Sequence, residues 1–447
     1  MNAAPSSRPE RAGWLSRRAF LTHGSRTLAA AAFFPQVIPR GVLAAAGRPG
    51  ANDRIGIGFV AIGRQASGLL AMLPGLPETR VLAFADLNLK RAQEAAAKHH
   101  AVALQDYRQL LDRADVDAII TATPDHWRAL VCLHACQAGK DIYAEKPMTL
   151  TIREGRLLVA AVRKYRRVFQ TGSQQRSSWP NRCGCDLVRR GVLGKISRVI
   201  AHNYPSPWEC AFAAEPVPEG LDWDRWCGPV HPVPYHPDLY LPRAKPGWIS
   251  FRPFSGGEMT GWGAHGLDQV QWALGMDASG PLEAWTEGPR FNPPTYQTPE
   301  PQARGDQTCS QPKVFFRYHG DIVVELGEGP AGGGLFIGEK GRLTIDRGVC
   351  KSEPAEIAER ALEQRPSGLT ENHLRNWVDC LKTRQRPAAD VEIGHRTASV
   401  CHLGNIARWT GRRLRWDPVK EVFPNDPEAN RFLDRPRRKG YELPEKV

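Results

Sequence analysis

The sequence predicts an α/β fold: an N-terminal doubly wound parallel sheet, followed by an α+β domain with an open, mostly antiparallel sheet. Short apolar runs alternate with helical segments from residue 55 onward, and the first run ends in a glycine-containing turn. That alternation is typical of parallel sheets covered by helices. Further along, strand-like segments follow one another without long helices between them, which predicts the second sheet.

The chain of 447 residues is long enough for about two domains. Its patterns divide it into a leader (1–46), a parallel-sheet domain (52–176), an α+β domain (177–422) and a polar tail (423–447). One interpretation of the tail is a contact with a neighbouring subunit. No apolar run reaches the roughly 18 residues of a membrane span.

The first predicted strand leads into a turn that suits a dinucleotide. The turn matches G-x-G-x-x-G/A as Ala61, Gly63 and Ala66, with alanine in place of the first glycine. Gly63 allows the close backbone approach that a pyrophosphate needs, and Ala66 is accepted where the helix packs on the strand. This pattern predicts a Rossmann domain, with the turn residues at the cofactor: Ala61, Ile62, Gly63, Arg64 and Gln65.

A second predicted strand, residues 80–85, ends at Asp86. Asp86 lies about 20 residues after the glycine turn, the spacing at which a carboxylate binds the ribose hydroxyls of a dinucleotide. Because the same carboxylate repels a 2′-phosphate, NAD is the expected cofactor. Lys90 and Arg91 lie nearby in the sequence and leave NADP open.

The alternation continues to about residue 171. Helices are predicted over 89–98, 126–138 and 151–165, and strands over 118–122, 141–144 and 168–171. In such a sheet the ligand lies beyond the carboxyl ends of the strands. These ends are the segments 123–126, 145–147 and 172–176.

The three strand ends resemble the signature of the Gfo/Idh/MocA oxidoreductases, and the resemblance extends from about Asn52 to the C-terminus. In that family a Glu-Lys-Pro tripeptide carries a lysine that faces the nicotinamide and the substrate, and Lys146 occupies its place. The resemblance implies an NAD(P)-dependent enzyme of sugars or cyclitols. It also implies a nicotinamide pocket lined by Thr123, Pro124, His126, Glu145 and Gln174. A lysine in such a crevice can donate to a substrate oxygen.

Residues 256–268 resemble the second catalytic segment of that family, which commonly shows Asp-x-x-x-His. The pair lies one helical turn apart, so both side chains face the same substrate carbon. This chain keeps His265 but has Gly261 where the Asp is expected. A neutral imidazole there can act as general base. Glu258 and Asp268 are the candidates for a supporting acid or base.

The second domain has strand signals over 196–202, 313–318, 321–326 and 342–345, and helical signals over 372–382 and 394–410. The resemblance implies that its sheet covers the cofactor and serves a homo-oligomer, a dimer or tetramer. Aromatic residues gather before residue 265, and sugar rings stack on such side chains. A Pro-rich stretch, 227–246, reads as a long loop that could act as a lid.

The leader carries Ser-Arg-Arg-Ala-Phe-Leu at residues 16–21, before an Ala-rich, weakly apolar stretch. This resembles a twin-arginine export signal, with cleavage expected near Ala46. We therefore expect a periplasmic or other extracytoplasmic protein.

Other classes of function lack support in the sequence. The formal net charge is +13, but no nucleic-acid-binding motif organises the basic residues, so no nucleic-acid partner is expected. The close cysteine pairs, Cys132/Cys136 and Cys183/Cys185, lack metal-ligand spacing, so no metal is expected and a metal-dependent hydrolase is disfavoured.

Export raises a question about the redox cycle, because free NAD(H) is not expected to be regenerated outside the cytoplasm. A tightly held cofactor that is reduced and reoxidised within one cycle avoids this difficulty. One alternative is a redox-neutral NAD-dependent glycosidase. Another, suggested by the missing Asp and the altered glycine turn, is a catalytically weak protein that binds a carbohydrate.

Overall fold

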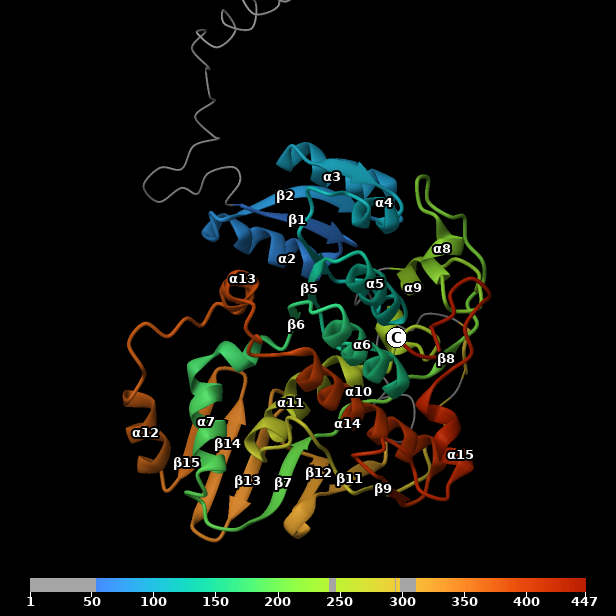
Figure 1. Ribbon diagram of the computed structural model, residues 1–447. Coiled ribbons are helices and arrows are strands. Elements are labelled where there is room, and N and C mark those ends of the chain that lie inside the picture. The colour runs from blue at the N-terminus through green and yellow to red at the C-terminus, as the bar shows by residue number, and fades with distance from the viewer. Residues whose placement is uncertain (1–53, 241–246, 294, 298–310) are drawn as a thin grey trace, which may run out of the picture. The chain divides into compact units, whose positions relative to one another are not determined.

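The computed structural model describes residues 54–240, 247–293, 295–297 and 311–447, and its first strands form a six-stranded parallel sheet (Figure 1). The strand order is β3-β2-β1-β4-β5-β6, which reverses direction between β1 and β4. The strands are β1 (Ile55–Val60), β2 (Thr79–Ala85), β3 (Val102–Leu104), β4 (Ala118–Thr121), β5 (Asp141–Ala144) and β6 (Phe169–Thr171).

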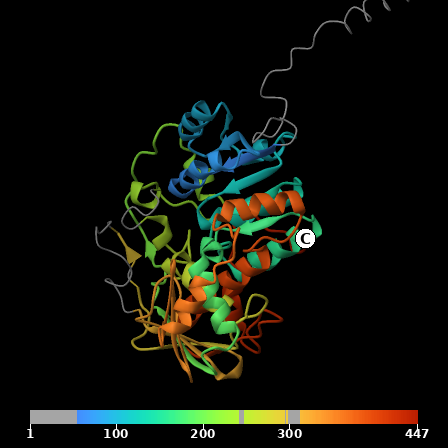
Figure 2. The same ribbon diagram turned by 90° about the vertical axis from the view of Figure 1, so that its left-hand side faces the viewer.

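Helices bury both faces of this sheet, as its apolar strands require. Phe84 of β2 points into one core with α2, α3 and α13, whereas its neighbours Ala83 and Ala85 point into the other with α4, α5 and α6. Figure 2 shows α13, in orange, beside the teal strands. The helices are α2 (Arg64–Met72), α3 (Leu89–His99), α4 (Tyr107–Leu111), α5 (Asp125–Gln137), α6 (Ile152–Lys164) and α13 (His373–Thr383).

The second sheet has eight strands in the order β15-β14-β13-β7-β12-β11-β9-β16. All neighbouring pairs are antiparallel except β7 and β12. The predicted fold class is therefore confirmed. The strands are β7 (Ile196–His202), β9 (Glu283–Glu287), β11 (Lys313–Arg317), β12 (Val323–Gly327), β13 (Gly334–Gly338), β14 (Gly341–Asp346), β15 (Val349–Glu353) and β16 (Leu414–Arg415).

Helix α14 (Val391–Thr410) links the two sheets, because it packs against α6 on one side and α11 (Gly263–Ala273) on the other. Most of its residues are buried, as expected of a helix surrounded by protein. Two glycines allow the close approach: a Cβ at Gly155 would collide with His395, and one at Gly394 would collide with Thr171.

Several short elements were not predicted. Strand β3, helix α4 and strands β9, β13 and β15 have only three to five residues each. So few residues give little hydrophobic periodicity to recognise in the sequence. The described residues of the connection after β7 form small elements: β8 (Glu209–Cys210), α8 (Trp223–Cys227), α9 (Pro237–Tyr240), η4 (Trp248–Ser250) and α10 (Glu258–Gly261). The remaining elements are η2 (Leu73–Gly75), η3 (Gln174–Ser177), α7 (Trp179–Arg189), β10 (Thr295–Tyr296), η5 (His319–Asp321), α12 (Glu356–Glu363), α15 (Pro427–Asn430) and η6 (Arg431–Leu433).

The C-terminal tail folds back onto its own chain. Arg437 pairs with Glu154 of α6 at 2.9 Å, and both side chains are at most 9% exposed. Beyond it, Tyr441, Leu443 and Val447 pack against the core that lies between the parallel sheet and α5. These residues of the tail therefore pack on their own chain, and the interpretation of the tail as a subunit contact stays a prediction.

Two of the sequence predictions fall wholly or partly outside the residues that the structure describes. The export leader, 1–46, lies outside them, as does part of the Pro-rich stretch, residues 241–246. Within the described ranges, no helix combines the length and apolar character that crossing a membrane requires.

Candidate active site

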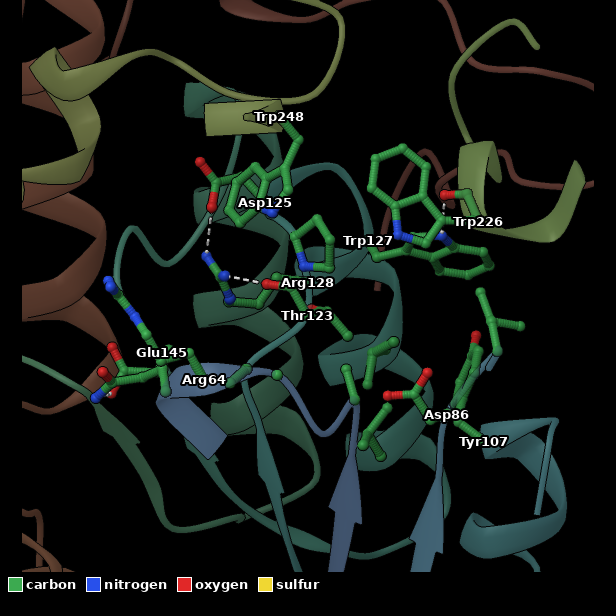
Figure 3. Close-up of a pocket in the computed structure, with 18 of the residues that line it drawn as sticks. Arg64, Asp86, Tyr107, Thr123, Asp125, Trp127, Arg128, Glu145, Trp226 and Trp248 are labelled. Atoms are coloured by element: carbon green, nitrogen blue, oxygen red, sulfur yellow. Dashed lines mark hydrogen bonds and ion pairs between the residues drawn. The ribbon is translucent and has the colours of Figure 1, made fainter. Parts of the chain in front are cut away.

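A crevice lies beyond the carboxyl ends of the parallel strands (Figure 3). It encloses about 1720 Å³ of empty space, part of which is open to solvent. Asp86, Tyr107 and Trp127 lie at one end in Figure 3, and Glu145 and Arg64 lie at the other. An elongated crevice at this edge is where a doubly wound sheet binds a dinucleotide.

The glycine turn connects the carboxyl end of β1 to the start of α2. Ala61, in place of the first glycine, has a left-handed backbone with φ of +65°, which explains why glycine suits this position. Gly63 has φ of −85°, and a Cβ built there would meet no protein atom within 4 Å. Space is thus left beside the backbone for a ligand. The first turn of α2 holds no acidic residue and no side-chain cap, so its N–H groups suit a phosphate.

Asp86 directly follows β2 and is only 8% exposed, yet it lines the crevice. Its Oδ2 accepts a 2.8 Å hydrogen bond from the backbone N–H of Ile62, and its Oδ1 accepts one of 2.8 Å from that of Asn88. Each carboxylate oxygen keeps a second acceptor position, which a ribose hydroxyl can use. Ile62 itself is buried away from the lining, and its N–H fixes the carboxylate instead.

Next to Asp86 the crevice is walled by aromatic rings from distant parts of the chain. The ring of Tyr441, in the tail, lies edge-on to Trp127 with centroids 5.4 Å apart, and Trp127 lies 5.9 Å from Tyr107. Flat apolar walls of this kind suit the adenine of a dinucleotide. The sequence analysis missed these residues, because no local pattern brings Tyr441 to α5.

Residues around α8 close over the same end. The indole N–H of Trp127 donates to the carbonyls of Arg225 and Trp226, at 3.0 Å each. His126, predicted at the nicotinamide, instead bonds the Trp226 carbonyl through Nε2 at 2.8 Å, between the rings of Trp226 and Phe254. It does not line the crevice, and burial lowers its pKa to about 4, so it is a neutral tether.

At the opposite end, Glu145 and Lys146 follow β5. Buried Glu145 accepts a 2.9 Å hydrogen bond from Gln65 and a 3.5 Å bond from Gln174. Burial raises its pKa, while the charge of Lys146 opposes the rise. Lys146 is partly exposed on the crevice wall and is attracted electrostatically to Glu145 and Asp125. The predicted residues Lys146, Glu145 and Gln174 therefore share one site.

Thr123 and Pro124, two of the residues predicted at the cofactor, follow β4 and line the same crevice. The hydroxyl Oγ1 of Thr123 is buried without a hydrogen-bond partner among the described residues. Buried polar atoms are seldom left unsatisfied, so this hydroxyl fits a site that takes a polar ligand.

Arg128 of α5 fixes the floor between the two strand ends, a role that the sequence analysis missed. It pairs with Asp125 at 3.1 Å and donates to the carbonyl of Thr123 (Figure 3). Its guanidinium also donates to the carbonyl of Pro147. Asp125 accepts a further 2.7 Å hydrogen bond from the hydroxyl of Ser255. The pair is at least 97% buried, so it holds the segments that carry Thr123 and Lys146 in a fixed register.

His265 lies in the first turn of α11, is 7% exposed and lines the crevice with Lys146. Its ring is edge-on to Trp262, with centroids 5.6 Å apart. Glu258, one of the two predicted supporting residues, lies in the preceding turn, where its Oε2 accepts a 3.2 Å hydrogen bond from Trp262 N–H. The site thus brings an imidazole and an ammonium group to one cavity, at which a hydroxyl can lose a proton.

Asp268, the other predicted supporting residue, is placed elsewhere. Both of its carboxylate oxygens lie 2.9 Å from Nε of Arg176, and Oδ1 accepts a 2.9 Å hydrogen bond from Thr397. It is 1% exposed and does not line the crevice. Its position fits a role in joining α11 to η3 and α14.

Two protein-family models match this chain. One, described as "Oxidoreductase family, NAD-binding Rossmann fold", matches residues 55–173. The other, described as "Oxidoreductase family, C-terminal alpha/beta domain", matches residues 186–443. Both models carry the Gfo/Idh/MocA name.

A curated relative, levoglucosan dehydrogenase of Pseudarthrobacter phenanthrenivorans, is 30% identical over 124 residues, which are 28% of this chain and 31% of that protein. The chain spans only 31% to 42% of the length of the first curated relatives that it matches.

Solved structures show the fold over a longer range. Aldose-aldose oxidoreductase of Caulobacter crescentus is similar with a TM-score of 0.56 at 16% identity, over 81% of this chain and 99% of that one. Scyllo-inositol dehydrogenase of Lactobacillus casei, solved with NAD(H) and scyllo-inositol, gives 0.53 at 15% identity over 81% and 99%.

Proposed function

Because this chain belongs to the Gfo/Idh/MocA oxidoreductase family, we propose that it transfers hydride between NAD(P) and a hydroxyl-bearing carbon of a sugar, cyclitol or glycoside. The observation that carries the proposal is that Lys146 and His265 line the same crevice as Gly63 and Asp86. The similar proteins named above, a levoglucosan, an aldose and an inositol enzyme, support this class of substrate.

The residues of the crevice fit a dinucleotide. The open space at Gly63 and the uncapped start of α2 suit a pyrophosphate, with Arg64 as a cation beside it. Asp86 would bind the ribose hydroxyls, and its negative charge favours NAD over NADP. Arg91 lies 3.6 Å from Asp86, which partly offsets that preference. When bound, the nicotinamide supplies the site that takes up or gives back a hydride.

Lys146 and His265 would act on the substrate hydroxyl. Lys146 interacts electrostatically with Glu145 and Asp125, and its ammonium group would donate to the substrate oxygen and stabilise negative charge there. His265 would accept the hydroxyl proton as the carbon is oxidised and return it in the reverse direction. Trp262 and Trp248 line this end and offer flat surfaces to a sugar ring.

A firmly retained cofactor is the second element of the proposal. The enclosure of one end by Tyr441, Trp127 and the carbonyls near α8 supports slow release. Slow release suits a redox-neutral cycle. It also suits the extracytoplasmic location that we propose from the twin-arginine-like segment at residues 16–21.

Substitution in the tail tests retention. We expect Tyr441→Ala to raise the dissociation rate of the dinucleotide about tenfold, because an aromatic contact is lost. Leu443→Ala is the matched control, since Leu443 packs on the same core but does not line the crevice. Equal release rates in both variants and the wild type would remove the tail from this role.

Activity is tested with purified protein and a panel of sugars, cyclitols and glycosides, by following the absorbance of the reduced nicotinamide. We expect Lys146→Ala and His265→Ala to lower the rate by about 10²- to 10⁴-fold. Lys164→Ala and His319→Ala are controls, because both residues are exposed and lie outside the crevice. If sugars bind equally well to all variants and no reduction occurs, the protein is a carbohydrate-binding module.

A further inference from the structure

Most charged side chains that line the crevice have a partner. The arginines paired with carboxylates are Arg91, Arg108, Arg128 and Arg225, at distances from 3.1 to 3.9 Å. Lys146 lies in the field of two carboxylates, and Arg64 stands at the turn assigned to the pyrophosphate. Arg347 remains: it lines the crevice, and no carboxylate in the described part of the chain forms an ion pair with it.

The turn that carries Arg347 between β14 and β15 is firmly held. Oδ1 of Asp346 accepts 2.8 Å hydrogen bonds from the N–H groups of Gly332 and Arg347. Asn181, which is 0% exposed, donates to the Asp346 carbonyl and accepts from Gly348 N–H, at 2.9 Å each. Gly348 supplies the positive φ, +70°, that the turn needs. An exposed arginine is therefore presented from a rigid support.

The guanidinium of Arg347 lies over the indole of Trp262, 5.7 Å from its centroid. That contact restrains the guanidinium and leaves its N–H donors available in its plane. Trp262 in turn contacts His265 at 5.6 Å. Arg347 is thus placed at the end of the crevice where the proposed proton acceptor lies.

We propose that the substrate carries an oxyanion, as a sugar acid or as a sugar sulfate or phosphate, and that Arg347 binds it. This rests on the proposed function, because the sugar must lie beside His265. A guanidinium fork matches carboxylate, sulfate and phosphate oxygens with paired hydrogen bonds. An unpaired cation in a concave, partly enclosed site also raises the local concentration of anionic ligands.

The test compares ligands that differ only in the anion. Calorimetry on the protein as purified would measure the affinity of D-glucose, D-glucuronate, glucose 6-sulfate and glucose 6-phosphate, and of the matching galactose set. We expect at least one anionic member to bind about ten- to a hundredfold more tightly than its neutral parent, the range expected for a charged hydrogen-bonded pair. Which member this is identifies the oxyanion.

Three variants assign the preference to the side chain. Arg347→Ala should abolish the preference and leave affinity for the neutral sugar within about twofold, and Arg347→Lys should keep part of it, as a point charge without the fork. Arg342→Ala is the matched control: Arg342 is an exposed arginine of β14, the strand that precedes the turn of Arg347, and it is paired with Glu353 at 2.5 Å. It should keep the full preference.

Two outcomes overturn the inference: neutral sugars that bind as tightly as every anionic partner, or an Arg347→Ala variant that weakens both members of a pair equally. Following nicotinamide absorbance in the same samples separates the two proposals. Oxidation of neutral sugars without an anion preference overturns this inference alone. Arg347-dependent binding of an anionic sugar without any redox change supports it and overturns the proposed oxidoreductase activity.

Discussion

The carboxylate of Glu258 fills the space in which a side chain at Gly261 would begin. Its Oε2 lies 2.6 Å from the position of a Cβ built on Gly261, and Cδ1 of Ile249 lies 3.0 Å from the same point. A carboxylate from one turn earlier thus lies where a side chain at position 261 would start. The glycine is what allows Glu258 to fold back toward Trp262 N–H.

Restoring the expected Asp should therefore fail on its own. We predict that Gly261→Asp lowers the free energy of unfolding by about 1–3 kcal/mol, because the new side chain overpacks the space that holds Glu258 and Ile249. Urea denaturation measures this. The double variant Glu258→Ala/Gly261→Asp should recover most of the loss. A Gly261→Asp variant as stable as the wild type would show that the space is not occupied as described.

The backbone of Ala61 is strained at the dinucleotide turn, because its φ of +65° is left-handed. A left-handed alanine costs roughly 1–2 kcal/mol, and the greater freedom of glycine in the unfolded chain offsets about 0.4–1 kcal/mol of what Ala61→Gly would gain. We predict that this variant is about 0.5–1 kcal/mol more stable in urea and still binds dinucleotide. A loss of stability would contradict the left-handed assignment of φ +65°.

The pair of Arg128 and Asp125 should be a large single contribution to the integrity of the site. Arg128→Met leaves Asp125 buried without its partner, which costs about 3–5 kcal/mol. Arg153→Met is the control, because Arg153 pairs with Asp434 at 3.3 Å on the surface, with 46% and 34% exposure, and should cost under about 1 kcal/mol. Adding Asp125→Asn to Arg128→Met should regain part of the loss. Similar effects of Arg128→Met and Arg153→Met in urea would contradict this assignment.

Buried histidines predict how stability depends on pH. Burial lowers the pKa of His126, His373 and His402 from 6.5 to about 4. The unfolded chain therefore binds these protons first, and their stabilising contribution, present above about pH 6.5, is lost as the pH falls toward 4. Each histidine lowers the free energy of unfolding by up to about 1.4 kcal/mol per pH unit in that window.

Urea denaturation at about pH 7, 6 and 5 measures the slope. His402→Gln keeps a hydrogen-bond donor toward the Thr149 carbonyl, which His402 Nε2 meets at 3.1 Å, but cannot titrate. In this variant the free energy of unfolding should therefore change less steeply with pH, by the amount that one proton contributes. A stability that is constant or rises on acidification between pH 6.5 and 4 would contradict the buried neutral state.

The sequence was sufficient to predict the features of the fold and site that depend on local residue patterns. The alternation of strands and helices predicted the parallel sheet, and its strand ends led to Asp86, Lys146 and Thr123, which do line the crevice. His126 was misplaced because a helix turns its side chains in different directions, and this one faces Phe254 rather than the cavity.

What the sequence could not predict depends on contacts between distant segments. Tyr441 reaches Trp127 only because the tail returns to α5, and Arg347 reaches Trp262 only through the turn between β14 and β15. Asp268 could not be separated from Glu258 without knowing that Arg176 pairs with it in the core. Such pairings follow from tertiary packing, which no spacing of residues encodes.

The central claim is that a dinucleotide lies in the crevice with its pyrophosphate against Gly63, and Gly63→Val tests it most directly. A Cβ there meets no protein atom within 4 Å, so the variant should fold with unchanged stability while its side chain takes the space left for the ligand. Gly68→Val, another open position but outside the crevice, is the control. Calorimetry with NAD and NADP on protein freed of ligand should show binding to the wild type and Gly68→Val, and a loss of at least about a hundredfold for Gly63→Val. Binding of neither dinucleotide to the wild type, or equal binding to all three proteins, would contradict the account.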